Sequence, residues 1–227
     1  MKEELWLIWK HPVTRRRYKV GSLIYDDSKY IFKYTNPELD EASSNGFLYF
    51  PGFENVNIEY ENEKLFANIE TRLPNPARPD YLEILNTYNL KKSSSQIEIL
   101  KATRGRLITD NYEFVPAFDT NKIEFDVAGT RHCSDVKKCI SLSLINVNDK
   151  LELEQDPENV YDPYAVKVIL KKNNVRYHLG YVPRYYSKQL SILLNDQVQY
   201  SAMIESLKLE SKLSDEDITA LVKLIFN

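Results

Sequence analysis

Short apolar runs and alternating segments occupy the start of the chain. Leu5–Trp9 is a β-prone apolar run, Tyr18–Tyr25 follows a polar turn, and Lys29–Tyr34 alternates apolar with polar residues. These segments predict an antiparallel meander of three strands. Tyr112–Pro116 has the same character and is expected to add a closing strand.

The segments between these strands predict short helices. The prolines of Thr71–Asp80 exclude a regular helix there, and Asp80 is expected to cap a helix over Tyr81–Tyr88. A second helix is expected over Ile97–Thr103. A short helical piece is expected around Pro37–Glu41.

The second half of the chain has the strand pattern again. Strands are expected over Ile123–Ala128, Leu151–Glu154, Ala165–Leu170, Val175–Leu179 and Val198–Lys208. The sequence Lys171–Asn174 lies between the third and fourth of these segments and predicts a tight hairpin.

Two helices are expected to flank these strands. The first follows Pro183 and has leucines at spacings of three and four. The second is a terminal helix that opens at Ser214–Asp217. Its expected apolar face consists of Ile218, Leu221, Val222 and Ile225.

This order of elements predicts an α+β protein with two modules, residues 1–118 and 119–227. The chain has 227 residues, which suits two small domains. It is rich in Tyr, with 16, and poor in Gly, with 6, which favours sheet and supplies rings for stacking. The net charge is −3, which argues against broad, nonspecific coating of duplex nucleic acid.

The chain has 2 cysteines, Cys133 and Cys139, which cannot form a disulfide framework. It contains no apolar run of membrane-spanning length, and its first residues lack the apolar core of a signal peptide. We therefore expect a soluble, cytoplasmic protein.

Residues suited to binding concentrate in Val127–Tyr186. Gly129 permits a bend at a strand end, and Gly180 allows close packing of the segment that follows it. The loop Asn159–Tyr164 places polar and aromatic groups just before a buried strand.

Cations and aromatic rings come together in this region. Arg131, Tyr161, Tyr181 and Arg184 would surround one concavity. Rings stack on bases and guanidinium groups pair with phosphate, so the set suits an unpaired nucleotide. The alternative is that the loop Asp only caps a turn and that the tyrosines only pack.

Three blocks in this region resemble the HIRAN domain. They are Ala128–Arg131, Glu158–Val168 and Gly180–Arg184, and the likeness extends over about residues 123–205. The resemblance implies a small β-barrel of OB-like character that receives the 3′ end of single-stranded DNA.

Carried over by position, the resemblance implies a role for each residue of the blocks. Arg131 would contact the strand backbone, Tyr161 and Tyr181 would flank the terminal bases, Asp162 would accept from the 3′-hydroxyl, and Arg184 would reach a phosphate.

Two further residues adjoin this set. His132 stands where a DNA-end-binding relative has Tyr, and its ring can still stack and form hydrogen bonds. Lys188 lies one helical turn after Arg184. It would share a phosphate with Arg184 or remain a solvated lysine.

The first half of the chain resembles the small N-terminal subdomain of HipA-type kinases. The likeness covers about residues 5–117 and rests on Val20–Leu23, Tyr30–Tyr34, Arg72–Pro74 and Ile99–Pro116. No Gly-rich phosphate loop or catalytic Asp–Asn arrangement accompanies it. The resemblance therefore implies a regulatory, protein-contacting module.

Catalysis is the least favoured interpretation. His132 and the two cysteines lack zinc-site spacing, and no nucleophile elbow is present. The acidic residues of Glu152–Glu158 alternate like the solvent face of a strand, and Arg15–Arg17 is expected to decorate a hairpin. We expect a DNA-binding protein that is not an enzyme and has no metal or cofactor. The alternative is an antitoxin-like regulator that docks a HipA-family kinase.

Overall fold

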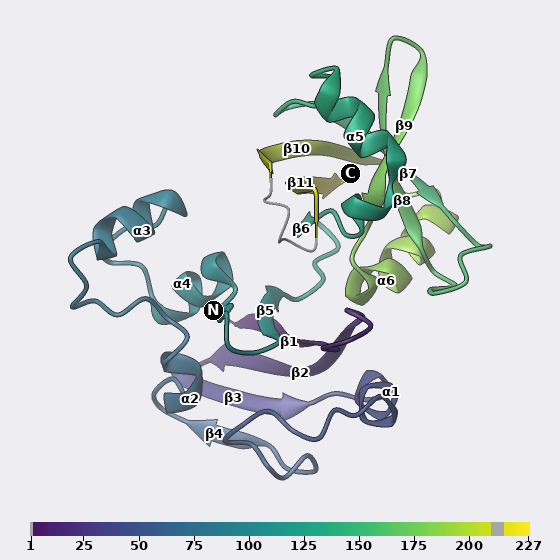
Figure 1. Cartoon of the computed structure of the whole chain (residues 1–227). Helices are drawn as coiled ribbons and strands as arrows, with labels where there is room; N and C mark the ends of the chain where they lie inside the picture. The colour runs from purple at the N-terminus through teal and green to yellow at the C-terminus, as the bar shows by residue number, and fades with distance from the viewer. Residues whose placement is uncertain (1, 210–215) are drawn as a thin grey trace. The chain divides into compact units, whose positions relative to one another are not determined.

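The computed structural model describes residues 2–209 and 216–227. The chain forms two compact units, Met1–Ala117 and Phe118–Asn227, and each contains one antiparallel sheet with a few short helices (Figure 1). The α+β class expected from the sequence is therefore correct. Within the described residues, no helix is both long and apolar enough to cross a bilayer.

From residue 2 onwards, the first unit forms five strands and four short helices. In chain order they are β1 (Glu3–Lys10), β2 (Arg17–Asp26), β3 (Lys29–Tyr34), α1 (Glu38–Ser44), β4 (Tyr60–Asn62), α2 (Ala67–Glu70), α3 (Tyr81–Thr87), α4 (Gln96–Thr103) and β5 (Tyr112–Pro116). The sequence predicted most of these elements, but it gave no signal for β4 or α2.

The first sheet has the strand order β4-β3-β2-β1-β5, so the predicted closing strand β5 pairs with β1. Every residue of Leu5–Trp9 is buried, which is why the segment lacks alternation. Leu5, Leu7 and Trp9 pack in a core with Phe32 and Phe114. This core is rich in aromatic rings.

The starts of α4 and α3 in the first unit differ in their capping. Ser95 and Glu98 form a reciprocal capping box at the start of α4. Asp80 was expected to cap α3, but its side chain makes no cap hydrogen bond. It instead pairs with Arg78, whose Nη2 lies 2.8 Å from Asp80 Oδ2. The nearby guanidinium therefore competes successfully with the helix amides for this carboxylate.

A buried carboxylate joins β5 to the start of β2 and to the segment after α4. Glu113 is 6% exposed and faces three guanidinium groups. Arg17 Nε lies 3.1 Å away, Arg106 Nη2 2.5 Å and Arg104 Nη1 3.9 Å. Burial alone would raise the pKa of Glu113, but the cations of Arg106, Arg17 and Arg104 lower it to about 2.

The described residues of the second unit form six strands, two α-helices and one short 3₁₀ helix. In chain order they are β6 (Lys122–Asp126), η1 (Thr130–His132), α5 (Ser134–Ser141), β7 (Lys150–Gln155), β8 (Val166–Lys172), β9 (Val175–Tyr181), α6 (Arg184–Asn195), β10 (Tyr200–Leu209) and β11 (Ile218–Phe226). The sequence analysis did not predict α5, which buries Val136 and Cys139 on one face.

The second sheet has the strand order β6-β11-β10-β7-β8-β9. The predicted hairpin joins β8 to β9 through Asn173 and Asn174, whose positive φ angles of 51° and 61° suit a two-residue turn. The edges β6 and β9 approach each other through one isolated bridge between Ala128 and Tyr181. The small barrel that the HIRAN resemblance implies is thus not confirmed as closed, because no continuous strand ladder joins these edges within the described residues.

The expected terminal helix is wrong. Residues Ile218–Phe226 form β11, which pairs with β10 and β6, while residues 214 and 215 of the expected helix start lie outside the described residues. Ile218, Ala220, Val222 and Leu224 are buried at every second position. This period of two competed with a helical period in the same residues, and pairing with two neighbouring strands decided between them.

Candidate functional site

The candidate site is built around the C-terminal end of β9. Here the backbone of Tyr181 exchanges two hydrogen bonds of 2.8 Å with that of Ala128. Gly180 makes this approach possible, because a Cβ at that position would lie 2.5 Å from Ala128 O and 2.7 Å from Val127 Cγ1. Its φ of 142° also disfavours any side chain. The sequence analysis had assigned Gly180 this packing role.

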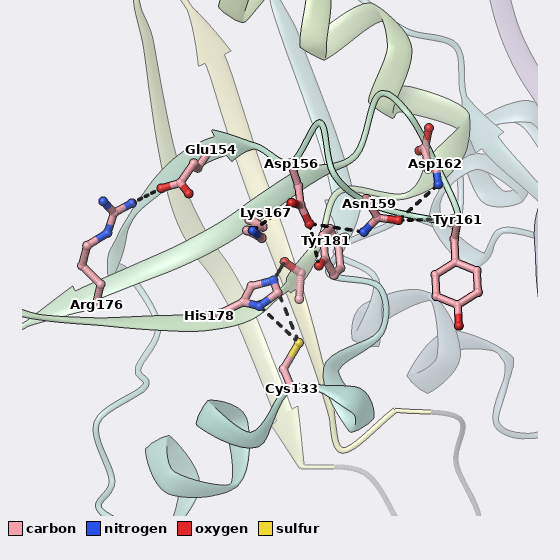
Figure 2. Close-up of polar contacts among 11 residues, drawn as sticks. Cys133, Glu154, Asp156, Asn159, Tyr161, Asp162, Lys167, Arg176, His178 and Tyr181 are labelled. Atoms are coloured by element: carbon pink, nitrogen blue, oxygen red, sulfur yellow. Dashed lines mark hydrogen bonds and ion pairs between the residues drawn. The ribbon is translucent and has the colours of Figure 1, made fainter.

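The side chain of Tyr181 is held by a carboxylate at the end of β7. Its hydroxyl donates to Asp156 Oδ2 at 3.0 Å, and Lys167 Nζ lies 3.0 Å from Asp156 Oδ1 (Figure 2). Burial and this hydrogen bond raise the pKa of Tyr181 to about 12, so the phenol stays protonated and can donate. Burial opposes ionisation of Asp156, but the hydrogen bonds from Lys167, Asn159 and Tyr181 hold its pKa below the usual value.

Asn159 shapes the loop that follows. Its Oδ1 accepts from the backbone N–H groups of Tyr161 at 3.0 Å and Asp162 at 3.1 Å. Its Nδ2 donates to Asp156 Oδ2 at 3.3 Å. One amide therefore links the end of β7 to the Tyr161–Asp162 turn. Figure 2 shows the Tyr161 ring extending away from these contacts, and this residue is 72% exposed.

Asp162 joins the loop to α6. Its Oδ1 accepts from the Tyr164 N–H at 2.9 Å, and its Oδ2 accepts from the Ser187 hydroxyl at 2.6 Å. Both carboxylate oxygens therefore have partners within the unit. A carboxylate oxygen can accept more than one hydrogen bond, so a role as acceptor for a ligand hydroxyl would come in addition to this structural role.

Cationic residues lie at the start of α6, beside Asp162. Ser187 Oγ lies 2.8 Å from the backbone oxygen of Arg184, and Lys188 follows Ser187 directly in the chain. Arg184 and Lys188 are four residues apart and share one helix face. The Lys188 ammonium lies 5.7 Å from the centre of the Tyr164 ring.

Arg131 and His132 lie on η1, which follows Ala128 in the chain and contacts β9. The carboxylate of Glu216 accepts from the N–H groups of Gly129 at 3.0 Å and Thr130 at 2.6 Å. Arg131 Nε lies 3.8 Å from Asp217 Oδ1. The His132 side chain is exposed. Two acidic residues just before β11 thus contact the segment that the resemblance assigns to DNA backbone contact.

A cysteine and a histidine meet between η1 and β9. His178 Nε2 lies 3.0 Å from Gly180 O and must donate to it, which leaves Nδ1 facing Cys133 Sγ at 3.8 Å. Burial and the neighbouring carboxylates raise the pKa of Cys133 to about 11, so the thiol stays protonated. This pair therefore does not form an activated nucleophile. Among the described residues, no group of three or more His, Cys, Asp or Glu is placed to hold a metal ion.

The structure thus links some of the expected residues by hydrogen bonds around the end of β9 and places the others on the neighbouring elements η1 and α6. Tyr161, Asp162 and Tyr181 are linked through hydrogen bonds of Asp156 and Asn159. Arg184 and Lys188 adjoin Asp162 through Ser187. Arg131 and His132 lie on η1, which contacts β9, and the Arg131 guanidinium lies 3.8 Å from Asp217 Oδ1.

Sequence reasoning missed several supporting residues: Asp156, Asn159, Lys167, Ser187 and Glu216. Asp156 and Asn159 lie within or beside the quoted loop block and were available as signals. Ser187 and Glu216 carried no local signal, because their partners are 25 and 86 or 87 residues away in the chain.

The structure also shows what other sequence candidates do. Glu152 and Glu154 are exposed and face Arg176 across the strands, as expected for a solvent face. Asp156 differs from them because it organises the loop. In the run Arg15–Arg17, the last residue does more than decorate a hairpin, since it pairs with the buried Glu113.

Comparison with known proteins adds a family to this geometry. Residues 120–220 match the model of the HIRAN domain. The crystal structure of the HIRAN domain of human HLTF is 18% identical, covers 48% of this chain and 77% of its own, and has a TM-score of 0.35. A Lactobacillus plantarum protein is 20% identical, covers 46% of this chain and 92% of its own, and has a TM-score of 0.33. No curated protein matched.

The matched residues fall in the second unit and include the whole candidate site. The first unit lies outside the matched range, so its resemblance to the HipA N-terminal subdomain is not shown and stays a prediction. The two solved structures have low sequence identity and low TM-scores, so the likeness of the second unit to a HIRAN domain rests on the family model alone. That match supports a HIRAN domain in the second unit of this chain.

Proposed function

We propose that the second unit binds single-stranded DNA and holds its 3′ end, without catalysing a reaction. The HIRAN match of residues 120–220 supports DNA binding. The observation that carries the proposal is the loop after β7, where Asn159 and Asp162 fix the backbone while the Tyr161 ring stays 72% exposed. Because the backbone that carries the ring is already fixed, stacking of a base on the ring does not have to order the loop as well.

The charges of the site suit one strand end better than a long duplex. Arg131, Arg184 and Lys188 lie on the elements around the strand end of β9, where Lys167 also pairs with Asp156. If each contacts one phosphate of a single strand, the logarithm of the affinity should fall with the logarithm of salt concentration at a slope of about −2.

Fluorescence anisotropy tests the proposal directly. Labelled oligonucleotides would carry either a free 3′-hydroxyl or a 3′-phosphate block. We expect tighter binding to the free end and a loss of affinity of at least about tenfold in the Arg131→Ala/Tyr161→Ala variant, since stacking on one base contributes about 1–3 kcal/mol.

A matched control variant is Arg176→Ala/Tyr88→Ala. It removes the same residue types at exposed positions, on β9 away from the site and in the first unit. This control should bind like the wild type. Equal binding by both variants, or no binding by the wild type, would overturn the proposal. Recovery of intact strand after incubation with Mg²⁺ or Mn²⁺ is the expected result for a protein that only binds, and strand cleavage would contradict it.

A further inference from the structure

Tyr164 and Lys188 form a second aromatic and cationic pair next to the proposed end-binding residues. Tyr164 lies on the loop two residues after Asp162 and is 41% exposed. Lys188 lies on α6 and is also exposed. Its ammonium is 5.7 Å from the centre of the Tyr164 ring, within the range of a cation–π contact.

One carboxylate positions both members of the pair. The Tyr164 N–H donates to Asp162 Oδ1 at 2.9 Å, and the Ser187 hydroxyl donates to Asp162 Oδ2 at 2.6 Å. Because Lys188 follows Ser187, Asp162 fixes the loop that carries the ring and the helix turn that carries the ammonium. The pair is therefore held in place at its backbone, beside Tyr161.

We propose that Tyr164 and Lys188 form a second nucleotide subsite, which binds the nucleotide next to the terminal one. The ring would stack on the base and the ammonium would contact the adjoining phosphate. This inference rests on the proposed function of the second unit. It extends that function from the capture of a single end to the binding of at least two consecutive nucleotides.

The geometry of α6 gives the subsite a direction. Arg184 and Lys188 share one helix face and are separated by four residues, about 6 Å along the axis. This separation is of the same order as that of neighbouring phosphates in an extended single strand. If one phosphate of a DNA strand contacts Arg184 and the strand follows this helix face, the next phosphate lies at Lys188.

The second unit contains a similar lysine–tyrosine pair whose ring is buried, and this pair provides a control. The Lys138 ammonium lies 5.5 Å from the centre of the Tyr177 ring, but Tyr177 is only 6% exposed. A base cannot stack on a covered ring, so this pair can serve only in packing. Lys138→Ala therefore removes the same charge and the same kind of contact without touching the proposed subsite.

The test combines protein variants with a modified strand. One oligonucleotide lacks the base of the nucleotide next to the 3′ end, and a second lacks a base far from that end. For the wild type, anisotropy should show about a tenfold loss of affinity for the first strand and little change for the second. Tyr164→Ala should cause the same loss with the intact strand and no further loss with the first abasic strand.

Control variants separate stacking from a structural role. Tyr164→Phe keeps the ring and should bind like the wild type, and Lys138→Ala should also bind normally. Lys188→Ala should weaken binding and reduce the salt slope by about 0.7. If the Tyr164→Ala and abasic effects multiply independently, or if Tyr164→Ala binds normally, the subsite is wrong while end binding stands. If the wild type binds no strand, the proposed function fails as well.

Discussion

The two units use partly or fully buried carboxylates in opposite ways. In the first unit, Glu113 meets guanidinium groups from Arg17, Arg104 and Arg106. In the second, Asp162 meets a backbone N–H and a hydroxyl. The first arrangement joins distant segments through one buried carboxylate. The second shapes a loop and leaves the neighbouring ring of Tyr161 exposed.

This difference shows how the partner determines what a carboxylate does. Cations compensate the charge of Glu113 so well that its pKa falls despite burial. Amide and hydroxyl donors fix direction more than they neutralise charge. We therefore expect changes at Glu113 to act on stability, and changes around Asp162 to act on binding.

The largest expected effect follows from Glu113→Gln. The neutral amide removes the buried negative charge that three guanidinium groups face, so the free energy of unfolding of the first unit should fall by about 3–5 kcal/mol. Both tryptophans of the chain, Trp6 and Trp9, lie on β1, so tryptophan fluorescence during urea unfolding reports on this unit alone.

The matched control for this variant is Glu61→Gln. Glu61 pairs with Lys29 at 3.6 Å, and both side chains are more than half exposed. Its replacement should change the free energy of unfolding by less than about 1 kcal/mol. Equal effects of the two substitutions would show that the arginine cluster contributes no more than an ordinary surface pair.

Acid should weaken the same cluster by a somewhat smaller amount. The pKa of Glu113 falls from 4.5 to about 2 on folding, so its stabilisation is complete above about pH 4.5 and is lost as the pH falls towards 2. The loss amounts to about 3 kcal/mol. Urea unfolding at pH 5, 4 and 3 should show a steeper decline for the wild type than for Glu113→Gln. Parallel declines would contradict this account.

A smaller effect on stability, with a clear effect on binding, is expected for Asn159→Ala. The variant loses the acceptor for the N–H groups of Tyr161 and Asp162. Stability should fall by about 1 kcal/mol, hydrogen exchange at these two amides should accelerate, and affinity for a 3′-ended strand should fall about tenfold.

Asn146→Ala provides the comparison for this loop variant. Asn146 is exposed in another loop of the second unit, and its side chain donates to Leu144 O at 3.3 Å. It should leave binding unchanged. Unaltered exchange and binding in Asn159→Ala would mean that the exposed tyrosine does not depend on this amide for its position.

Local pattern was enough to predict most strands, because their signals lie within a few residues. The β8–β9 hairpin is an example, since Asn173 and Asn174 alone suit its tight turn. The pattern misled where two periods coexist, as in Ile218–Phe226, which became β11. It was silent for β4 and α2, which are only 3 and 4 residues long.

The candidate site was predicted in part. The residue types of the loop and of the β9 end pointed to rings and cations, and a family resemblance gave them their expected roles. Neither source indicated that Asp156 would bind the Tyr181 hydroxyl, or that Glu216 would accept from the Gly129 and Thr130 amides. Such contacts join segments that are far apart in the sequence, so no local residue spacing predicts them.

The sequence by itself determined the α+β class and the strands that short turns connect to their neighbours. It also determined the block of residues that matches a HIRAN domain. Only the tertiary structure decided that β11 is a strand, that Glu113 lies among arginines, and that Lys188 reaches Tyr164. The physical reason is that hydrophobic periodicity and turn propensity act over a few residues. Strand pairing and charge compensation depend instead on which distant segments folding brings together.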